Sequence, residues 1–209
     1  MLIKGLYAIT PDIADTDLLL KKVEAALLGG ASVLQYRNKT ANQQLQTQQA
    51  RALLSLCRQY SVPLIINDSV KLCLTLDADG VHLGTNDGIL AEVRATIGSD
   101  KIFGVSCYNR FDLALQAQDQ GASYVAFGAC LTSITKPNAP VASLDLFTKA
   151  KTDLDIPAVA IGGINLQNAP QLIKAGASSI AVINAIFNPL FTTDDIKSAS
   201  QQFSIMFTH

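Results

Sequence analysis

The stretch GASYVAFGACLTSITKPNAPVASLDLFTKAK, residues 121–151, contains one complete unit of the fold. Its opening GAS is typical of a short connection between a helix end and a strand. The apolar run YVAF at 124–127 is short enough for a buried strand, and residues 144–151 have the pattern of a helix. The loop between them is too long for a simple turn, and loops of that length are typically functional or disordered.

The loop at 127–140 carries the first candidate binding residues. Ser133 and Thr135 supply hydroxyls, Lys136 supplies an ammonium group, and prolines at 137 and 140 stiffen the segment. Hydroxyl donors and a point charge suit an anionic ligand. A solvated surface loop remains the alternative for this segment alone.

The same strand and helix rhythm repeats along the chain. GAS recurs before apolar runs at 30–33, 121–124 and 176–179. Strands are predicted at 5–10, 33–36, 64–66, 80–83, 102–106, 124–127, 158–161 and 179–183. Helices are predicted at 16–28, 41–60, 70–76, 90–97, 111–120, 144–151, 168–175 and from 194 onward. Alternating apolar strands and helices predict a parallel sheet covered by helices. Eight units predict a single (β/α)8 TIM barrel over residues 1–209. An open doubly wound sheet is the alternative fold, although no GxGxxG follows the first strand.

The composition narrows the class of protein. The 209 residues are 49% hydrophobic and 16% charged, with a net charge of −1 and no basic cluster or Trp, which argues against a nucleic-acid surface. No run approaches the roughly 18 apolar residues of a membrane span, and a secretory signal is not expected at the N-terminus. Cys57, Cys73, Cys107 and Cys130 lack metal-binding spacing, and most of them are expected to be buried in a reduced cytosol. We therefore expect a soluble cytoplasmic protein.

Polar residues collect where the predicted strands end. They are Gln35, Arg37, Lys39, Asn67, Asp68, Asp87, Ser106, Ser133, Thr135, Lys136, Gly162, Gly163 and Asn184. The opposite strand ends carry mostly Gly, Ala and Pro. Active sites of this fold lie at the C-terminal ends of the strands. The asymmetry therefore predicts an active site there.

The residue types indicate the chemistry. Arg37, Lys39 and Lys136 give three positive charges, enough to hold a diphosphate. Asp68 and Asp87 offer hard oxygen ligands, and Mg2+ is typically held by one or two carboxylates together with phosphate oxygens. The alternative for each Asp is an N-cap, because both precede predicted helices.

Gly162 and Gly163, with Ile183 and Asn184 after the last strand, match the phosphate-binding corner common in this fold. A glycine pair that only makes a tight turn is the alternative. Two anion sites and a metal site predict a Mg-dependent transferase that displaces diphosphate.

His82 lies within a predicted strand and is expected to be structural, whereas Cys107 and Cys130 lie near strand ends and could line the cavity.

Many of these candidate residues lie in a series of short sequence segments. They are LYAIT (6–10), QYRNK (35–39), IIND (65–68), DGVHLGTND (79–87), GVS (104–106), SITK (133–136), AIGGI (160–164) and AVINAIF (181–187). In this order, over nearly the whole chain, they resemble the thiamine phosphate synthase family. The resemblance implies coupling of 4-amino-2-methyl-5-hydroxymethylpyrimidine diphosphate to 4-methyl-5-(2-phosphoethyl)thiazole, or its carboxylate. The products would be thiamine phosphate and diphosphate, with the pyrimidine methylene ionising before the thiazole nitrogen attacks.

The resemblance also implies roles for individual residues. The pyrimidine diphosphate would be bound by Gln35, Tyr36, Arg37, Asn38, Lys39, Asn67, Ser106 and Lys136, of which Arg37, Ser106 and Lys136 would be catalytic. The thiazole phosphate would be bound by Ser133, Ile134, Thr135, Gly163, Ile183 and Asn184. One Mg2+ per subunit would be held by Asp68 and Asp87. The expected partners are these small-molecule substrates, with no nucleic acid or membrane, and the resemblance leaves a homo-oligomer open.

Some positions depart from the family pattern. Thr85, Ser133 and Asn184 stand where the family often has Gln, Thr and Ser, and Cys107–Tyr108 replaces a common Thr–His pair. Ser keeps the hydroxyl and Asn still donates a hydrogen bond, so these changes would tune thiazole binding. A thiazole tautomerase is one alternative, a non-catalytic thiamine-precursor-binding protein is another, and a sugar-phosphate isomerase is a third. The retained diphosphate and metal residues favour the synthase.

Overall fold

The computed structural model describes residues 3–84, 88–128 and 143–208. The strands are β1 (Gly5–Ile9), β2 (Ala31–Tyr36), β3 (Leu64–Asn67), β4 (Gly80–Gly84), β5 (Ile102–Tyr108), β6 (Tyr124–Phe127), β7 (Ala158–Ile161) and β8 (Ser179–Val182). The helices are α1 (Thr16–Leu28), α2 (Gln43–Gln59), α3 (Val70–Leu76), α4 (Leu90–Ile97), α5 (Phe111–Asp119), α6 (Leu144–Asp153), α7 (Ala169–Ala175) and α8 (Thr193–Ser204), followed by the 3-10 turn η1 (Ile205–Phe207).

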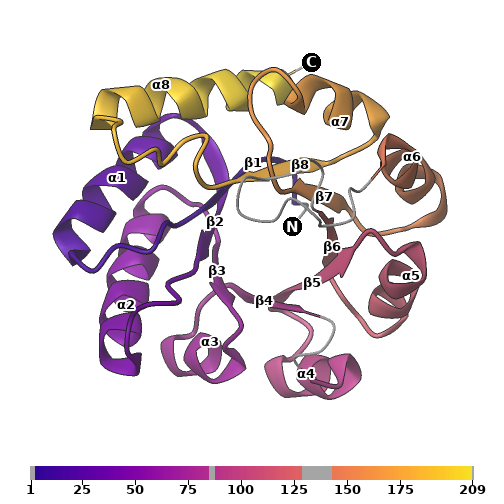
Figure 1. Cartoon of the computed structure of the whole chain (residues 1–209). Coiled ribbons are helices and arrows are strands. Elements are labelled where there is room, and N and C mark those ends of the chain that lie inside the picture. The colour runs from indigo at the N-terminus through magenta and orange to yellow at the C-terminus, as the bar shows by residue number, and fades with distance from the viewer. Residues whose placement is uncertain (1–2, 85–87, 129–142, 209) are drawn as a thin grey trace.

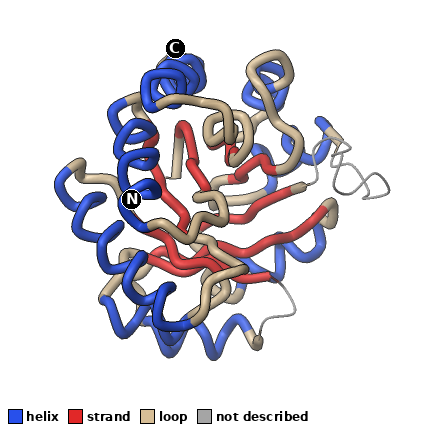
Figure 2. Tube along the Cα trace, turned by 60° about the vertical axis from the view of Figure 1, so that its left-hand side comes forward, coloured by secondary structure: helices blue, strands red, loops and turns tan. Residues whose placement is uncertain are grey.

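The strands form one closed parallel barrel. Each strand pairs with its sequence neighbours, and β1 also pairs with β8, from Gly5 opposite Ser179 to Ala8 opposite Val182. The helices surround this ring (Figure 1), and the turned view shows the strands enclosed by them (Figure 2). The predicted (β/α)8 barrel is confirmed.

Side chains alternate along each strand between two apolar layers. Inward-facing residues such as Tyr7, Val33 and Ile65 fill the barrel in one buried cluster. Outward-facing residues such as Leu6 and Leu34 join the buried faces of the helices in a second, larger cluster. Near-continuous apolar strands are the consequence, because both faces of every strand are covered.

Local sequence signals account for several element boundaries. Asp15 caps α1, with its carboxylate accepting a hydrogen bond from Leu18 N at 3.0 Å. The predicted bounds of α3, α4, β6 and β7 are those of the structure. The leading glycine of each GAS repeat has a left-handed φ, which explains why glycine ends these helices.

β5 differs from the prediction because it continues two residues past Ser106, to Tyr108. Its pairing with β6 shifts register between Ser106 and Tyr108, and Tyr108 has a φ of 52°. Such an irregularity re-aims side chains at the rim of a barrel. Cys107 is buried in the outer cluster, so the expectation that it lines the cavity is wrong.

Cys57, Cys73 and Cys107 are free and buried, and for Cys57 and Cys73 this is the expected outcome. Cys130 lies outside the described residues. Among the described helices, none combines the length and the apolar character that crossing a bilayer requires.

Candidate active site

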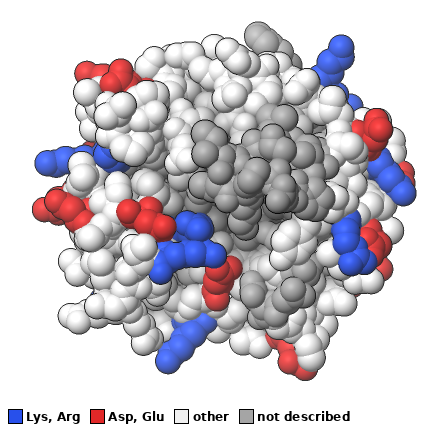
Figure 3. Space-filling view, in the orientation of Figure 1, with Lys and Arg blue, Asp and Glu red and all other residues white. Residues whose placement is uncertain are grey.

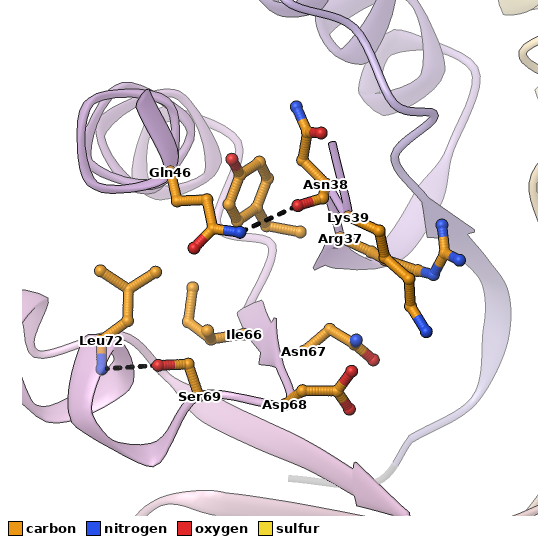
Figure 4. Close-up of a pocket in the computed structure, with 10 residues that line it drawn as sticks. Arg37, Asn38, Lys39, Gln46, Ile66, Asn67, Asp68, Ser69 and Leu72 are labelled. Atoms are coloured by element: carbon orange, nitrogen blue, oxygen red, sulfur yellow. Dashed lines mark hydrogen bonds between the residues drawn. The ribbon is translucent and has the colours of Figure 1, made fainter. Parts of the chain in front are cut away.

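A cavity of about 200 Å3 opens between the C-terminal ends of β2 and β3. Its lining residues are Tyr36, Arg37, Asn38, Lys39, Gln46, Ile66, Asn67, Asp68, Ser69 and Leu72. Figure 4 shows Lys39, Asn67 and Asp68 turned toward the same opening, with Arg37 beside Lys39. The cavity therefore brings together two cations, an amide and a carboxylate that the sequence predicted to act together.

Side chains of two residues that follow β1 form hydrogen bonds with the backbone of Arg37 and Lys39 and so fix the position of both residues. Thr10 Oγ1 accepts a hydrogen bond from Arg37 N and donates one to Arg37 O, both at 2.9 Å. Asp12 Oδ1 accepts from Lys39 N at 2.9 Å and lies 3.5 Å from Arg37 Nη1. The Asp12 and Arg37 side chains are each about one-third exposed, so water screens this ion pair and leaves Arg37 available to a stronger anion.

Asp68 occupies an unusual backbone conformation at the end of β3. Its φ is +60°, in the left-handed region, and its backbone N donates to His82 O at 2.9 Å. The N-cap of α3 is Ser69, whose Oγ accepts from Leu72 N at 3.2 Å. The capping alternative is therefore wrong for Asp68, which is exposed at the mouth of the cavity.

Tyr36 and Asn38 also line the cavity, and their side chains form hydrogen bonds within the protein. Tyr36 faces α2, and its hydroxyl donates to Gln49 Oε1 at 2.9 Å. Burial, with a smaller contribution from Asp12, raises the pKa of Tyr36 to about 12. Asn38 is 5% exposed and points away from Asn67 and Asp68 in Figure 4.

The Asn38 amide is fully used within the protein. Its Nδ2 donates to Ile13 O and to Gln49 Oε1, each at 3.1 Å, and its Oδ1 accepts from Thr40 and Ala41. The side chains of Tyr36 and Asn38 therefore support the loop that carries Arg37 and Lys39, and both residues line the cavity.

Gln35, Asn67 and Ser106 occupy inward-facing positions near the top of the barrel. Gln35 is 4% exposed, and its Nε2 donates to Tyr7 Oη at 3.0 Å. Ser106 Oγ lies 2.8 Å from His82 Nε2. His82, expected to be only structural, is thus bonded to a predicted catalytic residue. His82 lies on the inward face two residues before the end of β4, and this position could have indicated that it reaches the site.

A second cavity, of about 230 Å3, opens between the ends of β7 and β8. Its lining includes the segments 161–164 and 181–185. Gly162 and Gly163 have φ values of 98° and 68°, a left-handed pair that only glycine adopts readily. Asn168 Nδ2 donates to Gly163 O at 3.1 Å and so fixes the orientation of this peptide.

The backbone after β8 completes this corner. Ile186 N and Phe187 N both bond to Ile183 O, which forms a single helical turn. Within the described ranges, the N–H groups of Gly163, Asn184 and Ala185 donate to no backbone carbonyl. Backbone N–H groups that have no carbonyl partner are available to bind an anion.

Several predicted site residues lie outside the described residues. They are Asp87, Ser133, Ile134, Thr135 and Lys136, together with Thr85 among the departures from the family pattern. In the described part of the chain, no three His, Cys, Asp or Glu side chains group as a metal site. Figure 3 shows acidic and basic side chains meeting over β2 and β3, at the margin of a central hollow.

The fold places these two cavities on the same rim of a (β/α)8 barrel, the rim where active sites of this fold lie. The family model for thiamine monophosphate synthase matches residues 6–186. Similar proteins include a thiamine-phosphate synthase of Methylobacillus flagellatus, 55% identical over 98% of this chain and 96% of that protein. Another, from Nitrosospira multiformis, is 49% identical over 98% of this chain and 86% of that protein.

A solved structure agrees with the sequence relatives. The thiamine phosphate pyrophosphorylase of Pyrococcus furiosus has a TM-score of 0.84 and 32% identity, covering 98% of this chain and 95% of that one. The chain belongs to the thiamine monophosphate synthase family. It is a transferase of thiamine biosynthesis, with thiamine-phosphate synthase function.

Proposed function

We propose that the chain couples 4-amino-2-methyl-5-hydroxymethylpyrimidine diphosphate to 4-methyl-5-(2-phosphoethyl)thiazole, or its carboxylate, in a Mg-dependent reaction that releases diphosphate. One observation carries the proposal: two separate cavities lie on the same rim, one between β2 and β3 and one between β7 and β8, with β1 between them. Two corners suit two phosphorylated substrates held for reaction over the barrel mouth.

The corner between β2 and β3 would hold the diphosphate. Arg37 and Lys39 are the cations of that cavity, and Lys136 would complete the set from the loop after β6. Guanidinium and ammonium groups stabilise diphosphate both in the substrate and as it departs. Gln35, Asn67 and Ser106 would contact the pyrimidine end of this substrate from the barrel interior.

Mg2+ would be held by Asp68 and Asp87. Asp68 fits this role because it is exposed at the cavity mouth, beside Asn67, and leaves the N-cap position to Ser69. Mg2+ needs only one or two carboxylates when phosphate oxygens and waters supply the remaining ligands. Bound Mg2+ would offset the negative charge that develops on the departing diphosphate.

The thiazole phosphate would occupy the corner between β7 and β8. The N–H groups of Gly163 and Asn184 would donate to the phosphate, and Ile183 would contact the ring. Ser133, Ile134 and Thr135 would approach from the loop after β6. This division of the rim keeps the two anions apart while their reacting ends face the barrel mouth.

With the uncarboxylated thiazole, the reaction balances without a base. The carboxylated thiazole would in addition lose CO2 and take up one proton at the carbon that carried the carboxylate. The bond between the pyrimidine methylene carbon and the diphosphate oxygen breaks, and its electron pair leaves with diphosphate. The thiazole nitrogen lone pair forms the new carbon–nitrogen bond, and this nitrogen carries no proton to remove. Arg37, Ser106 and Lys136 would stabilise the charge separation, so ionisation of the methylene can precede attack.

Diphosphate release from the purified protein tests the proposal. Both substrates, each substrate alone, and both with chelator in place of Mg2+ are compared. Release is expected only with both substrates and the metal, together with thiamine phosphate. Product formation that survives complete metal removal would exclude the metal assignment, and conversion of a thiazole without diphosphate release would favour the tautomerase.

We also place the reaction in the cytoplasm. The free thiols of Cys57, Cys73 and Cys107 suit a reducing compartment such as the cytoplasm.

A further inference from the structure

Five polar side chains from five strands form a continuous hydrogen-bonded chain through the barrel. Gln35 Nε2 donates to Tyr7 Oη at 3.0 Å, and Tyr7 Oη lies 2.7 Å from Tyr124 Oη. Tyr124 Oη lies 2.9 Å from His82 Nδ1, and His82 Nε2 lies 2.8 Å from Ser106 Oγ. The chain thus links two residues placed above at the pyrimidine end of the site.

Packing holds the middle of this chain rigidly. Tyr7 and Tyr124 are at most 1% exposed and meet edge to face, with ring centroids 5.9 Å apart. The His82 ring stacks on Tyr124 at 5.6 Å. Gly104 lies opposite Tyr124 in the β5–β6 pairing, and a Cβ at Gly104 would overlap the Tyr124 ring. Ser106, at the end of the chain, is only half-buried.

Which group donates in each of these hydrogen bonds follows from how many protons each group carries. Gln35 donates to Tyr7, so the single proton of Tyr7 is directed to Tyr124. The proton of Tyr124 then goes to His82 Nδ1. Burial raises the pKa of both phenols, so both remain protonated donors.

Neutral His82 must then carry its proton on Nε2, because Nδ1 is occupied as an acceptor. Nε2–H donates to Ser106 Oγ. The hydroxyl proton of Ser106 is consequently not donated to His82 and is available for another acceptor. In the reverse order, the buried Tyr7 proton would have no acceptor among these residues unless the Gln35 amide turned its oxygen toward Tyr7.

We propose that this chain sets the direction of the Ser106 hydroxyl, so that Tyr7, Tyr124 and His82 are positioning residues that make Ser106 a donor toward the barrel mouth. The proposal deepens the function above, since the acceptor would be an atom of the pyrimidine diphosphate. A serine that receives a hydrogen bond while donating one is also a stronger donor, because successive bonds polarise one another.

The tautomer of His82 is directly measurable. His82 and His209 are the only histidines, so 15N-histidine labelling gives a spectrum with few signals. Long-range proton–nitrogen correlation in the resting protein at about pH 8.5, above the ordinary histidine pKa of about 6.5, is expected to show His82 protonated on Nε2. Protonation on Nδ1 would overturn the proposal.

Tyr124→Phe tests what sets this tautomer. Loss of the phenol removes the donor to Nδ1, and the Nε2-protonated form is expected to lose its exclusive population. Tyr60→Phe is the matched control, because the Tyr60 hydroxyl bonds to Glu24 on the outside of the protein. An unchanged His82 tautomer in Tyr124→Phe would show that the chain does not control it.

A pair of His82 variants adds a kinetic test. His82→Gln can keep a donor near the Nε2 position and the bond to Ser106, whereas His82→Asn keeps a group near Nδ1 and loses that bond. We expect the Asn variant to lose about three- to tenfold more kcat than the Gln variant, with the KM for thiazole phosphate within about twofold of wild type. Equal losses, or a better Asn variant, would contradict a role exerted through Ser106.

A double-mutant cycle then separates positioning from general support. In a Ser106→Ala background, His82→Asn is expected to cause no further loss of kcat. A full additional loss would assign His82 a role independent of Ser106. The spectra need no substrate, so failure of the proposed reaction would leave the tautomer result standing, and the two hypotheses fail separately.

Discussion

The Thr10 hydroxyl group forms two hydrogen bonds with the backbone of Arg37, one as donor and one as acceptor. Thr10 Oγ1 donates to Arg37 O and accepts from Arg37 N, both at 2.9 Å, and Thr10 is completely buried. The hydroxyl thereby ties the residue after β1 to the residue after β2. The position of the Arg37 side chain in the proposed diphosphate corner depends on this contact.

Thr10→Val should weaken binding of the pyrimidine diphosphate. Valine keeps the shape but leaves the backbone N–H and C=O of Arg37 without their partner, at a cost of about 1 to 3 kcal/mol in the free energy of unfolding. The KM for the pyrimidine diphosphate should rise more than the KM for the thiazole phosphate. Thr10→Ser retains the hydroxyl and should behave almost as wild type. Equal KM changes for both substrates would argue against the separation of the two corners.

Asp68→Gly should abolish Mg-dependent turnover without unfolding the protein. Glycine adopts the left-handed conformation of Asp68 more readily than aspartate, so the free energy of unfolding should fall by no more than about 1 kcal/mol. Asp77→Gly is the matched control, because Asp77 has a φ of 53° at the end of α3, away from the cavity residues. Asp77→Gly should keep its turnover. Substantial turnover in Asp68→Gly would remove this carboxylate from the metal site.

Gly163→Ala should raise the KM for the thiazole phosphate selectively. An alanine at a φ of 68° strains the peptide whose N–H is proposed to meet the phosphate. Gly98→Ala is the control, since Gly98 has a φ of 79° at the end of α4 and a Cβ added there would meet no heavy atom within 4 Å. Gly98→Ala should lose comparable stability with no change in either KM. A similar KM change in both variants would point to global strain instead.

Gly104→Ala should destabilise the barrel interior. The added methyl group overlaps the Tyr124 ring, and overpacking of this kind costs about 1 to 3 kcal/mol. Displacement of Tyr124 should also disturb the His82 signals in the labelled spectrum. Chemical denaturation and that spectrum together check the prediction, and wild-type stability with an unchanged His82 would contradict it.

Alkaline pH should lower the free energy of unfolding through the buried thiols. Burial raises the pKa of Cys57 and Cys107 to about 12, and that of Cys73 to about 11, from 9.0. The raised folded pKa means that the stabilisation is complete below pH 9.0 and is lost as pH rises toward the folded values. Denaturation at a series of pH values should show this decline, and Cys57→Ala should reduce its slope. An identical slope in that variant would exclude Cys57 as a contributor.

The barrel could be predicted from the sequence because its strands carry one unambiguous signal. Runs such as Tyr124–Phe127 and Ala158–Ile161 are apolar on both faces and end at glycine, so their bounds were predicted without error. The end of β5 could not be, because the register shift after Ser106 depends on how β6 pairs with it. Local sequence does not contain that pairing.

The sequence predicted which strand-end residues lie together, but it did not predict the hydrogen bonds that their neighbours form. Arg37, Lys39, Asn67 and Asp68 share one cavity, as their strand-end positions indicated. Asn38 belongs to the same segment, yet its amide is used by Ile13 and Gln49. His82 was separated from Ser106 in the prediction because the two are adjacent only through the β4–β5 register, which no motif records.

The pairing of β1 with β8 has a consequence for biosynthesis. Ser179 Oγ donates to Gly5 O at 2.7 Å, and α1 packs against α8, so the first and last units of the chain complete each other. A nascent chain on the ribosome therefore exposes an open edge on β1 until β8 has been translated. That edge is a template for wrong pairing with another chain. Barrel closure therefore cannot precede translation of β8, and until then the unpaired edge of β1 is open to aggregation.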